Sequence, residues 1–301
     1  MSRPQLASLT PGTTAYTTAL NANGTAPSLT VGNPYLNPFR ATNLDLSFEK
    51  YFTHNGLIAV NFFKKDIATF PQQAALEAPL SAVFGPAIYN QLLSNLPTTA
   101  ACSPSLATTS LYQYTCNGGT WAVRQFQDSP GGDIKGVEVN LQTDFFFLPG
   151  FLKRFGVIAN YTHIESSLSY LTGTALNTSQ TVSGTAANSY AEGPFLNTSP
   201  DAFNATLYYE DKKFSARASV SYRGPYVDAG SGTGNVFEGY NAITNVDASV
   251  RYKLTDWIEL SGEGTNLTDA YRDRYTDTAA NRNYEYNHFG RTILFGARLK
   301  L

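Results

Sequence analysis

Residues 244–254, TNVDASVRYKL, alternate strictly between two kinds of side chain. Starting from Thr244, every second position carries Val246, Ala248, Val250, Tyr252 and Leu254. The positions between them carry Asn245, Asp247, Ser249, Arg251 and Lys253. Successive side chains of a strand face opposite sides, so the stretch predicts a strand with one apolar and one polar face.

The same alternation recurs along the chain, at 44–49, 137–142, 203–210, 214–223 and 292–301. Several segments keep the pattern for ten residues or more. A soluble sandwich also alternates, but its strands average ~5–6 residues. A tilted strand needs ~9–11 residues to cross a bilayer. The segment length therefore favours a membrane wall.

Short and long connections alternate along the chain. The short ones lie near 53–56, 148–152, 211–213 and 256. The long ones are polar and lie near 71–130, 167–198, 224–240 and 269–284. Bacterial outer-membrane barrels have short periplasmic turns and long extracellular loops. On this basis we expect nine strands, at 43–53, 57–70, 131–147, 153–168, 199–210, 213–223, 241–254, 257–268 and 285–301.

Three segments outside these strands also carry expectations. Residues 1–42 are expected to be an extracellular loop and a lead-in from a preceding strand, and 43–301 the C-terminal barrel portion. Residues 120–127 belong either to the long loop 71–130 or to an extension of the next strand above the membrane. Residues 72–96 have a helical apolar rhythm, broken at 85–86, that predicts a short helical hairpin.

An odd number of antiparallel strands cannot close the usual even-numbered bacterial barrel. An unclosed sheet would expose two edges of unsatisfied backbone groups to lipid, which the bilayer does not tolerate. The nine strands therefore predict that the wall needs partner strands absent from this sequence. Whether Met1 is a true start stays open.

Composition agrees with a membrane wall but does not decide it. Charged residues are 15% of the chain, below the ~25% usual for soluble domains, and it has 19 Tyr and 19 Phe. Such a balance suits a lipid-facing wall with aromatic girdles, although a soluble lectin-like β protein could share it. The net charge of −2 gives no basic field for nucleic acid.

The two cysteines, Cys102 and Cys116, are close enough in sequence to suggest a loop disulfide formed in an oxidising compartment. The alternative is two unrelated thiols. The three histidines, His54, His163 and His288, show no metal-ligand spacing. We expect neither a metal nor a cofactor.

Seven segments in order resemble TonB-dependent outer-membrane receptors. They are GNPYLNPFRATNLDLSFEKYF (32–52), IKGVE (134–138), FFFLPGFLKRFGVIANYTHIESS (145–167), NATLYYEDKKFSARASVSYRGPY (204–226), NVDASVRYKL (245–254), GTNLTDAY (264–271) and FGRTILFGARLKL (289–301). The family barrel has 22 strands around an N-terminal plug. The resemblance implies an all-β, antiparallel transmembrane β-barrel segment of about nine of those strands, with long extracellular loops. The plug, the TonB box and roughly thirteen strands have no counterpart in this sequence.

The resemblance also implies a function. A receptor of this family lies in the bacterial outer membrane and imports a scarce small molecule, such as a siderophore or an oligosaccharide. The TonB complex supplies the energy, and the partners are membrane lipid, the plug and the missing strands. The alternative is a passive outer-membrane porin or an adhesive β-barrel without energy coupling. We expect no enzyme, because no convergent Ser/His/Asp set stands at the strand tops.

Candidate site residues fall into two groups. Loops on a rigid scaffold usually carry recognition, and arginines pair with anions while aromatics stack on rings. The loop candidates are Tyr112, Tyr114, Trp121, Arg124, Arg272, Arg274, Tyr284 and Tyr286, although such tyrosines could equally be girdle residues. Charges on the polar strand face either solvate the lumen and pair with one another or grip the plug; they are Glu138, Arg217, Arg223, Asp247, Arg251, Glu263 and Arg298.

Overall fold

The computed structural model describes residues 13–17, 28–52, 56–82, 86–87, 89–90, 120–173, 189–228, 238–277 and 280–299. The chain forms two compact units. The larger unit comprises residues 43–65, 133–167 and 194–301, and the smaller one comprises 1–42, 66–132 and 168–193. No helix in the described ranges has the length and apolarity to cross a membrane.

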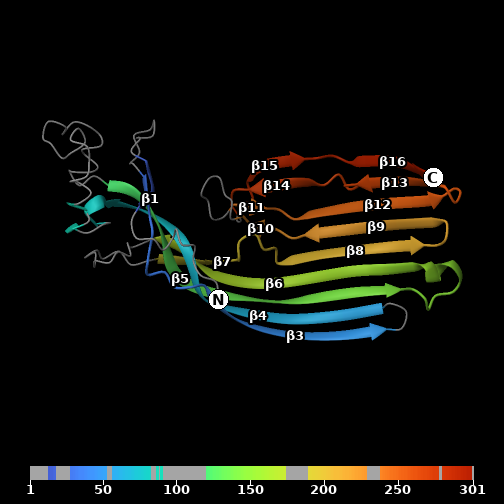
Figure 1. The fold of residues 1–301 in the computed structure, drawn as a ribbon, viewed down its shortest axis with the longest axis horizontal. Helices are drawn as coiled ribbons and strands as arrows, with labels where there is room; N and C mark the ends of the chain where they lie inside the picture. Colours follow the sequence, from blue (N-terminus) through green and yellow to red (C-terminus); the bar gives the residue numbers. More distant parts are fainter. Residues whose placement is uncertain are drawn as a thin grey trace. The chain divides into compact units, whose positions relative to one another are not determined.

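The larger unit is built on nine neighbouring strands, which confirms the expected number (Figure 1). Strand order follows chain order, and the five pairings from β6 to β16 are antiparallel. The strands are β3 (Arg40–Phe52), β4 (Gly56–Pro79), β5 (Thr120–Asp144), β6 (Phe155–Gly173), β8 (Asp201–Glu210), β9 (Phe214–Arg223), β12 (Ile243–Lys253), β13 (Ile258–Thr265) and β16 (Thr292–Leu299).

The register brings the apolar positions of neighbouring strands together on one face. Val246 of β12 lies opposite Val220 of β9, and Val220 lies opposite Ala205 of β8. Large apolar side chains on this face are open to the surroundings, and Phe295 of β16 is 88% exposed. A soluble sandwich would bury this face against a second sheet. An apolar face exposed over neighbouring strands is instead the outer surface of a lipid-facing wall.

The opposite face is polar, and its side chains contact one another across neighbouring strands. The side chain of Asn204 donates to Asn160 at 3.1 Å, the hydroxyls of Thr206 and Ser219 lie 2.8 Å apart, and Arg251 approaches Glu263 at 3.9 Å. Cross-strand pairs of this kind fix the register, because a slip of one residue would move every polar side chain to the apolar face.

Aromatic side chains form a row at each end of the apolar face. At the short-turn end, Phe155 packs on Tyr209 at 5.0 Å, and Tyr209 lies 5.9 Å from Phe214. At the long-loop end, Phe203 stacks on Tyr222 at 5.3 Å. Six residues separate the two rows along β8, or ~20 Å at ~3.3 Å per residue. Two such rows flanking an aliphatic band are the arrangement of interfacial girdles.

A turn interrupts the last of the expected strands. The last strand, expected at 285–301, is divided into β15 (Asn283–His288) and β16. Gly290, with φ of +74°, turns the backbone between them, and its carbonyl accepts a hydrogen bond from the Asn266 side chain at 2.9 Å. A left-handed residue ends the extended run, and glycine adopts that conformation without steric cost.

A second sheet of the larger unit is formed by residues expected to be loop together with 285–288, the start of the expected last strand. Its order is β10 (Tyr226–Val227), β11 (Gly239–Tyr240), β14 (Tyr271–Tyr275) and β15, all paired antiparallel. Strands of two residues leave no periodic signal in the sequence, which is why the pattern at 224–240 indicated only a loop.

The expected helical hairpin at 72–96 is wrong over 72–79, which belong to β4. β4 pairs with β3 and β5, and sheet pairing of this kind overrides a local helical rhythm. Beyond it, the described residues 80–82, 86–87 and 89–90 are helical. Residues 120–127 form the start of β5, which matches the strand-extension alternative.

The smaller unit contains β1 (Thr13–Thr17), β2 (Ser28–Val31), β7 (Ser189–Gly193) and the parts of β4, β5 and β6 that fall within 66–132 and 168–193. Its buried side chains include Val31, Trp121, Val123 and Leu168. The Gln72 amide nitrogen lies within hydrogen-bond distance of the Ser169 carbonyl at 2.7 Å, which ties β4 to β6 inside this unit.

Candidate functional site

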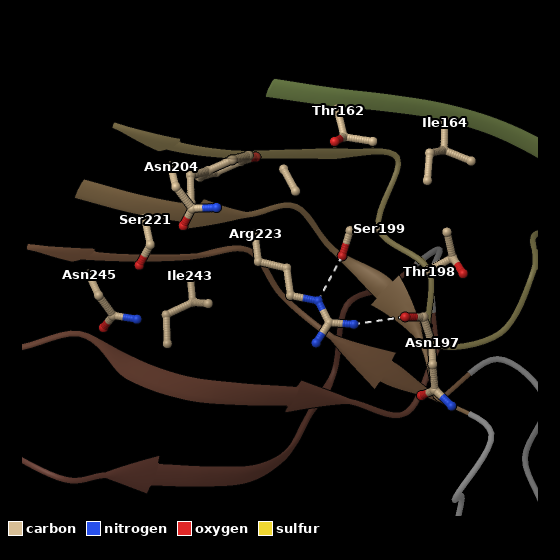
Figure 2. A pocket seen from close by; sticks show the side chains of 12 residues that line it. Thr162, Ile164, Asn197, Thr198, Ser199, Asn204, Ser221, Arg223, Ile243 and Asn245 are labelled. Carbon is tan, nitrogen blue, oxygen red and sulfur yellow. Dashed lines mark hydrogen bonds between the residues drawn. The ribbon is translucent and has the colours of Figure 1, made fainter. Parts of the chain in front are cut away.

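A pocket of about 550 Å³ opens on the polar face where β6, β8, β9 and β12 approach the long-loop end (Figure 2). The register places Thr162, Ala202, Arg223 and Ile243 side by side across these four strands. The next inward row is Asn160, Asn204, Ser221 and Asn245, and all but Asn160 line the pocket. Amides and hydroxyls thus surround a single guanidinium group.

Arg223, the last residue of β9, projects into this pocket and is held by the segment between β7 and β8. Its Nε donates to Ser199 Oγ at 3.0 Å and its Nη2 donates to the Asn197 carbonyl at 2.8 Å (Figure 2). The Asn197 amide in turn donates to the Val227 carbonyl at 2.7 Å. The Arg223 side chain is exposed, and no ion pair to it is found among the described residues.

A stack of two arginines and two tyrosines, Arg223, Tyr226, Tyr240 and Arg272, continues from the pocket onto the second sheet. The Arg223 guanidinium carbon lies 3.6 Å from the Tyr226 ring centre, the two tyrosine rings are 5.2 Å apart, and Arg272 lies 4.0 Å from Tyr240. Arg272 Nη2 also donates to Tyr226 Oη at 3.1 Å, and this hydrogen bond raises the pKa of Arg272. Each of the two guanidinium groups therefore lies within cation–π distance of a tyrosine ring.

Arg274, a loop candidate, has a different environment. It contacts Asp228 at 2.7 Å, the fully buried Glu238 at 2.6 Å and Glu285 at 3.5 Å. Tyr284, another candidate, lies with its ring 5.6 Å from the Arg274 guanidinium. Three carboxylates around one cation make Arg274 an anchor of the second sheet, since its charge is compensated within the protein.

The other loop candidates are scattered. Tyr286 packs on Tyr271 at 4.4 Å and is 55% exposed. Trp121 is buried and Arg124 exposed, both in the smaller unit. The remaining candidates, and the expected disulfide, lie outside the described residues: Tyr112, Tyr114, Cys102 and Cys116.

The charges expected to face the lumen share the polar face. Glu138 accepts from Asn61 at 3.4 Å, and Asp247 accepts from the Asn266 amide at 2.8 Å. Other members lie opposite polar partners across the strands: Arg217 opposite Ser249, Arg298 opposite Glu259, and Arg251 near Glu263. Among the described residues, the one ion pair between two members of this group is Arg251–Glu263, and Arg223 alone of the group enters the stack with Arg272.

Sequence reasoning missed four residues of the site: Asn197, Ser199, Tyr226 and Tyr240. Each depends on a turn or a two-residue strand. The segment SYRGPY (221–226) contains the one available signal, because the alternation of β9 places Arg223 on the polar face just before a Gly-Pro turn.

Comparison with known proteins now identifies the family. Residues 1–267 match the TonB-dependent receptor-like β-barrel model, so the chain belongs to that family. Its fold is therefore an antiparallel transmembrane β-barrel segment, with the apolar face toward lipid and the polar face toward the lumen.

Solved structures with the same fold include two variants of the ferric enterobactin receptor PfeA from Pseudomonas aeruginosa. One, a single-substitution variant, has 14% identity, covers 98% of this chain and gives a TM-score of 0.52. The other, a double-substitution variant, has 14% identity, the same 98% coverage and a TM-score of 0.51. The chain spans 36% of the length of each. No curated protein gave a match.

Proposed function

We propose that the chain forms the C-terminal barrel part of a bacterial outer-membrane receptor that imports an anionic, siderophore-type metal chelate with energy from TonB. The observation that carries this proposal is the pair of exposed guanidinium groups, Arg223 and Arg272, stacked on Tyr226 and Tyr240. Among the described residues, no ion pair to either is found.

The chemistry of the stack favours an anion with flat or conjugated groups. Guanidinium groups bind carboxylates, phenolates and phosphates through paired, charge-assisted hydrogen bonds, and tyrosine faces accept rings and cations. A neutral oligosaccharide would satisfy the amides and hydroxyls of the pocket but would leave both charges uncompensated. The ferric enterobactin receptors with the same fold support the siderophore choice within this family.

The wall and the family support the remaining parts of the proposal. An apolar face bounded by two aromatic rows suits the outer membrane, and membership of the TonB-dependent family supports energy coupling. A passive pore would need no ligand site built from fixed arginines, so the stack disfavours that alternative.

A double variant tests the ligand class. Arg223→Gln/Arg272→Gln in the intact receptor should weaken binding of ferric catecholate and other anionic chelates by at least roughly a hundredfold, because two charge-assisted contacts of ~1.5–3 kcal/mol each are lost. Equilibrium binding to purified receptor is the measurement, with a neutral oligosaccharide as the comparison ligand. Arg282→Gln is the matched control, because Arg282 is an exposed arginine near the second sheet, 78% exposed at its side chain and outside the stack.

Unchanged affinity for every anionic chelate in the double variant, with Arg282→Gln behaving identically, would contradict the proposed ligand class. Tight binding of the neutral oligosaccharide, with no effect of either variant, would favour the sugar-receptor alternative. Uptake in cells without TonB tests the energy coupling separately, and undiminished uptake there would favour a passive pore.

A further inference from the structure

The turn between β5 and β6 is unusually apolar for a short connection. Residues 145–155 read FFFLPGFLKRF. Phe146, Phe147 and Phe151 are 44%, 65% and 63% exposed, and the 3-10 turn Gly150–Arg154 buries none of its residues. Exposed turns are usually polar, so a concentration of phenylalanines at one turn marks a contact surface.

These rings continue the lipid-facing row beyond the ends of the strands. Phe147 lies 6.0 Å from Phe145, the residue directly after β5. Phe151 lies 6.4 Å from Phe155, which heads the aromatic row of the short-turn end. The apolar surface is therefore continuous from the aromatic row of the short-turn end into the turn between β5 and β6.

Basic side chains border the same turn. Arg154 Nη1 donates to Asp211 Oδ2 at 2.8 Å, which brings the turn after β8 beside the turn after β5, at one end of the sheet (Figure 1). Residues 153–154 and 211–213 carry four basic side chains and one acidic one, a net charge of +3. Asp211 pairs with Arg154, and no ion pair to Lys153 or Lys212 is found among the described residues.

We propose that this turn is a membrane anchor selective for anionic glycerophospholipids, resting on the outer-membrane location in the proposed function. The rings of Phe147 and Phe151 enter the acyl boundary, and the ammonium groups of Lys153 and Lys212 receive the lipid phosphate. Aromatic rings at the interface beside basic side chains attract anionic headgroups in this way. The turn is continuous with the lipid-facing apolar face and carries local positive charge, and both features favour lipid over a protein partner.

The test places a fluorescent reporter in the turn. The receptor carries Phe151→Trp, with Trp121, Trp257 and every tryptophan of the remaining receptor replaced by Phe, in bilayers of zwitterionic lipid with a brominated anionic phospholipid titrated in. Bromine quenches an indole only at close range, so quenching reports lipid beside the turn. We expect the anionic brominated lipid to quench at lower mole fraction than its zwitterionic counterpart.

Lys153→Gln/Lys212→Gln should reduce that selectivity about thirtyfold, because each basic side chain near an anionic surface contributes about a fivefold preference and the two preferences multiply. Lys135→Gln/Arg282→Gln removes two positive charges from the long-loop end and should leave selectivity unchanged. Equal quenching by both lipids, or full selectivity in the first variant, would overturn the proposal. No quenching by either lipid would also overturn it, because the turn would then stand in water, open to a periplasmic protein.

Binding of a ferric chelate, measured on the same samples, separates this proposal from the proposed function. Chelate binding should persist when the turn lysines are removed. Loss of lipid selectivity with intact chelate binding supports the anchor alone. Normal lipid selectivity in a receptor that binds no anionic chelate would leave the anchor standing and overturn the ligand assignment.

Discussion

At the residue scale, Asp211 shows how one carboxylate sets a turn. Its oxygens accept from the backbone amides of Lys213 and Phe214, each at 2.8 Å, and from the Tyr209 hydroxyl at 2.8 Å. These hydrogen bonds, the Lys213 amide foremost, lower the pKa of Asp211 from 3.8 to about 2. A lowered folded pKa means that the carboxylate stabilises the turn above pH 3.8 and that this stabilisation is lost as pH falls toward 2.

Asp211→Asn should therefore flatten the acid side of the stability curve. The urea-unfolding midpoint of the receptor in detergent should fall between about pH 4 and 2 in the parent, and fall less in the variant, because the variant has no proton to bind there. The unfolding midpoints of parent and variant should differ most near neutral pH, where only the parent has a charged carboxylate at position 211. Parallel curves over the whole range would show that this hydrogen-bonded carboxylate does not set the acid stability.

At the scale of elements, the second sheet depends on one buried ion-pair cluster. Arg274→Met should leave the fully buried Glu238 and the half-buried Asp228 without their cation, a loss of ~3–5 kcal/mol. Amide hydrogen exchange of Tyr226 and Gly239 should then rise by at least roughly a hundredfold, while the β8–β9 amides keep their protection.

The double variant Arg274→Met/Glu238→Met is the control for this cluster. Replacing Arg274 and Glu238 by apolar side chains removes the fully buried carboxylate together with its cation and leaves the partly exposed Asp228 uncompensated, so protection should partly return. Protection that falls further in the double variant would show that packing of the arginine stem, and not its charge, holds the second sheet.

The same scale shows what the sequence could and could not predict. Alternation over ten residues located the ends of β8, β9 and β12 within two residues. A strand with one apolar and one polar face leaves a period of two residues in the sequence. The second sheet has strands as short as two residues, and its bonds join segments far apart in the chain, so no local pattern encodes it. Arg223 was placed on the correct face, but its tyrosine partners were missed for this reason.

The alternation also could not predict where strands end. β4 runs to Pro79 and β5 begins at Thr120, well past the part of each strand that the apolar pattern marks. Arg274 and Arg272 are two residues apart and read alike in the sequence. Only the tertiary contacts with Asp228 and Glu238 distinguish an anchor from an exposed cation.

At the scale of the whole molecule, the nine-strand sheet has two edges. No pairing joins β3 to β16 in the part of the chain that the structure describes. Unpaired edge groups cost several kcal/mol each in hydrocarbon, so the wall is complete only with further strands of a 22-strand family barrel. The length comparison agrees, since the chain spans 36% of the PfeA receptor variants.

The central claim is that the apolar face meets lipid and the polar face meets a water-filled lumen, and alternating cysteines in β12 test it most directly. Single cysteines replace Asn245, Val246, Asp247, Ala248, Ser249 and Val250 in turn, in an intact receptor whose Cys102 and Cys116 are serine. Labelling in outer membranes by a water-soluble maleimide should be high at the odd positions and low at the even ones, with the reverse for a lipid-soluble maleimide. Equal labelling of both faces by the water-soluble reagent would contradict the account, since a sheet with water on both faces is not a membrane wall.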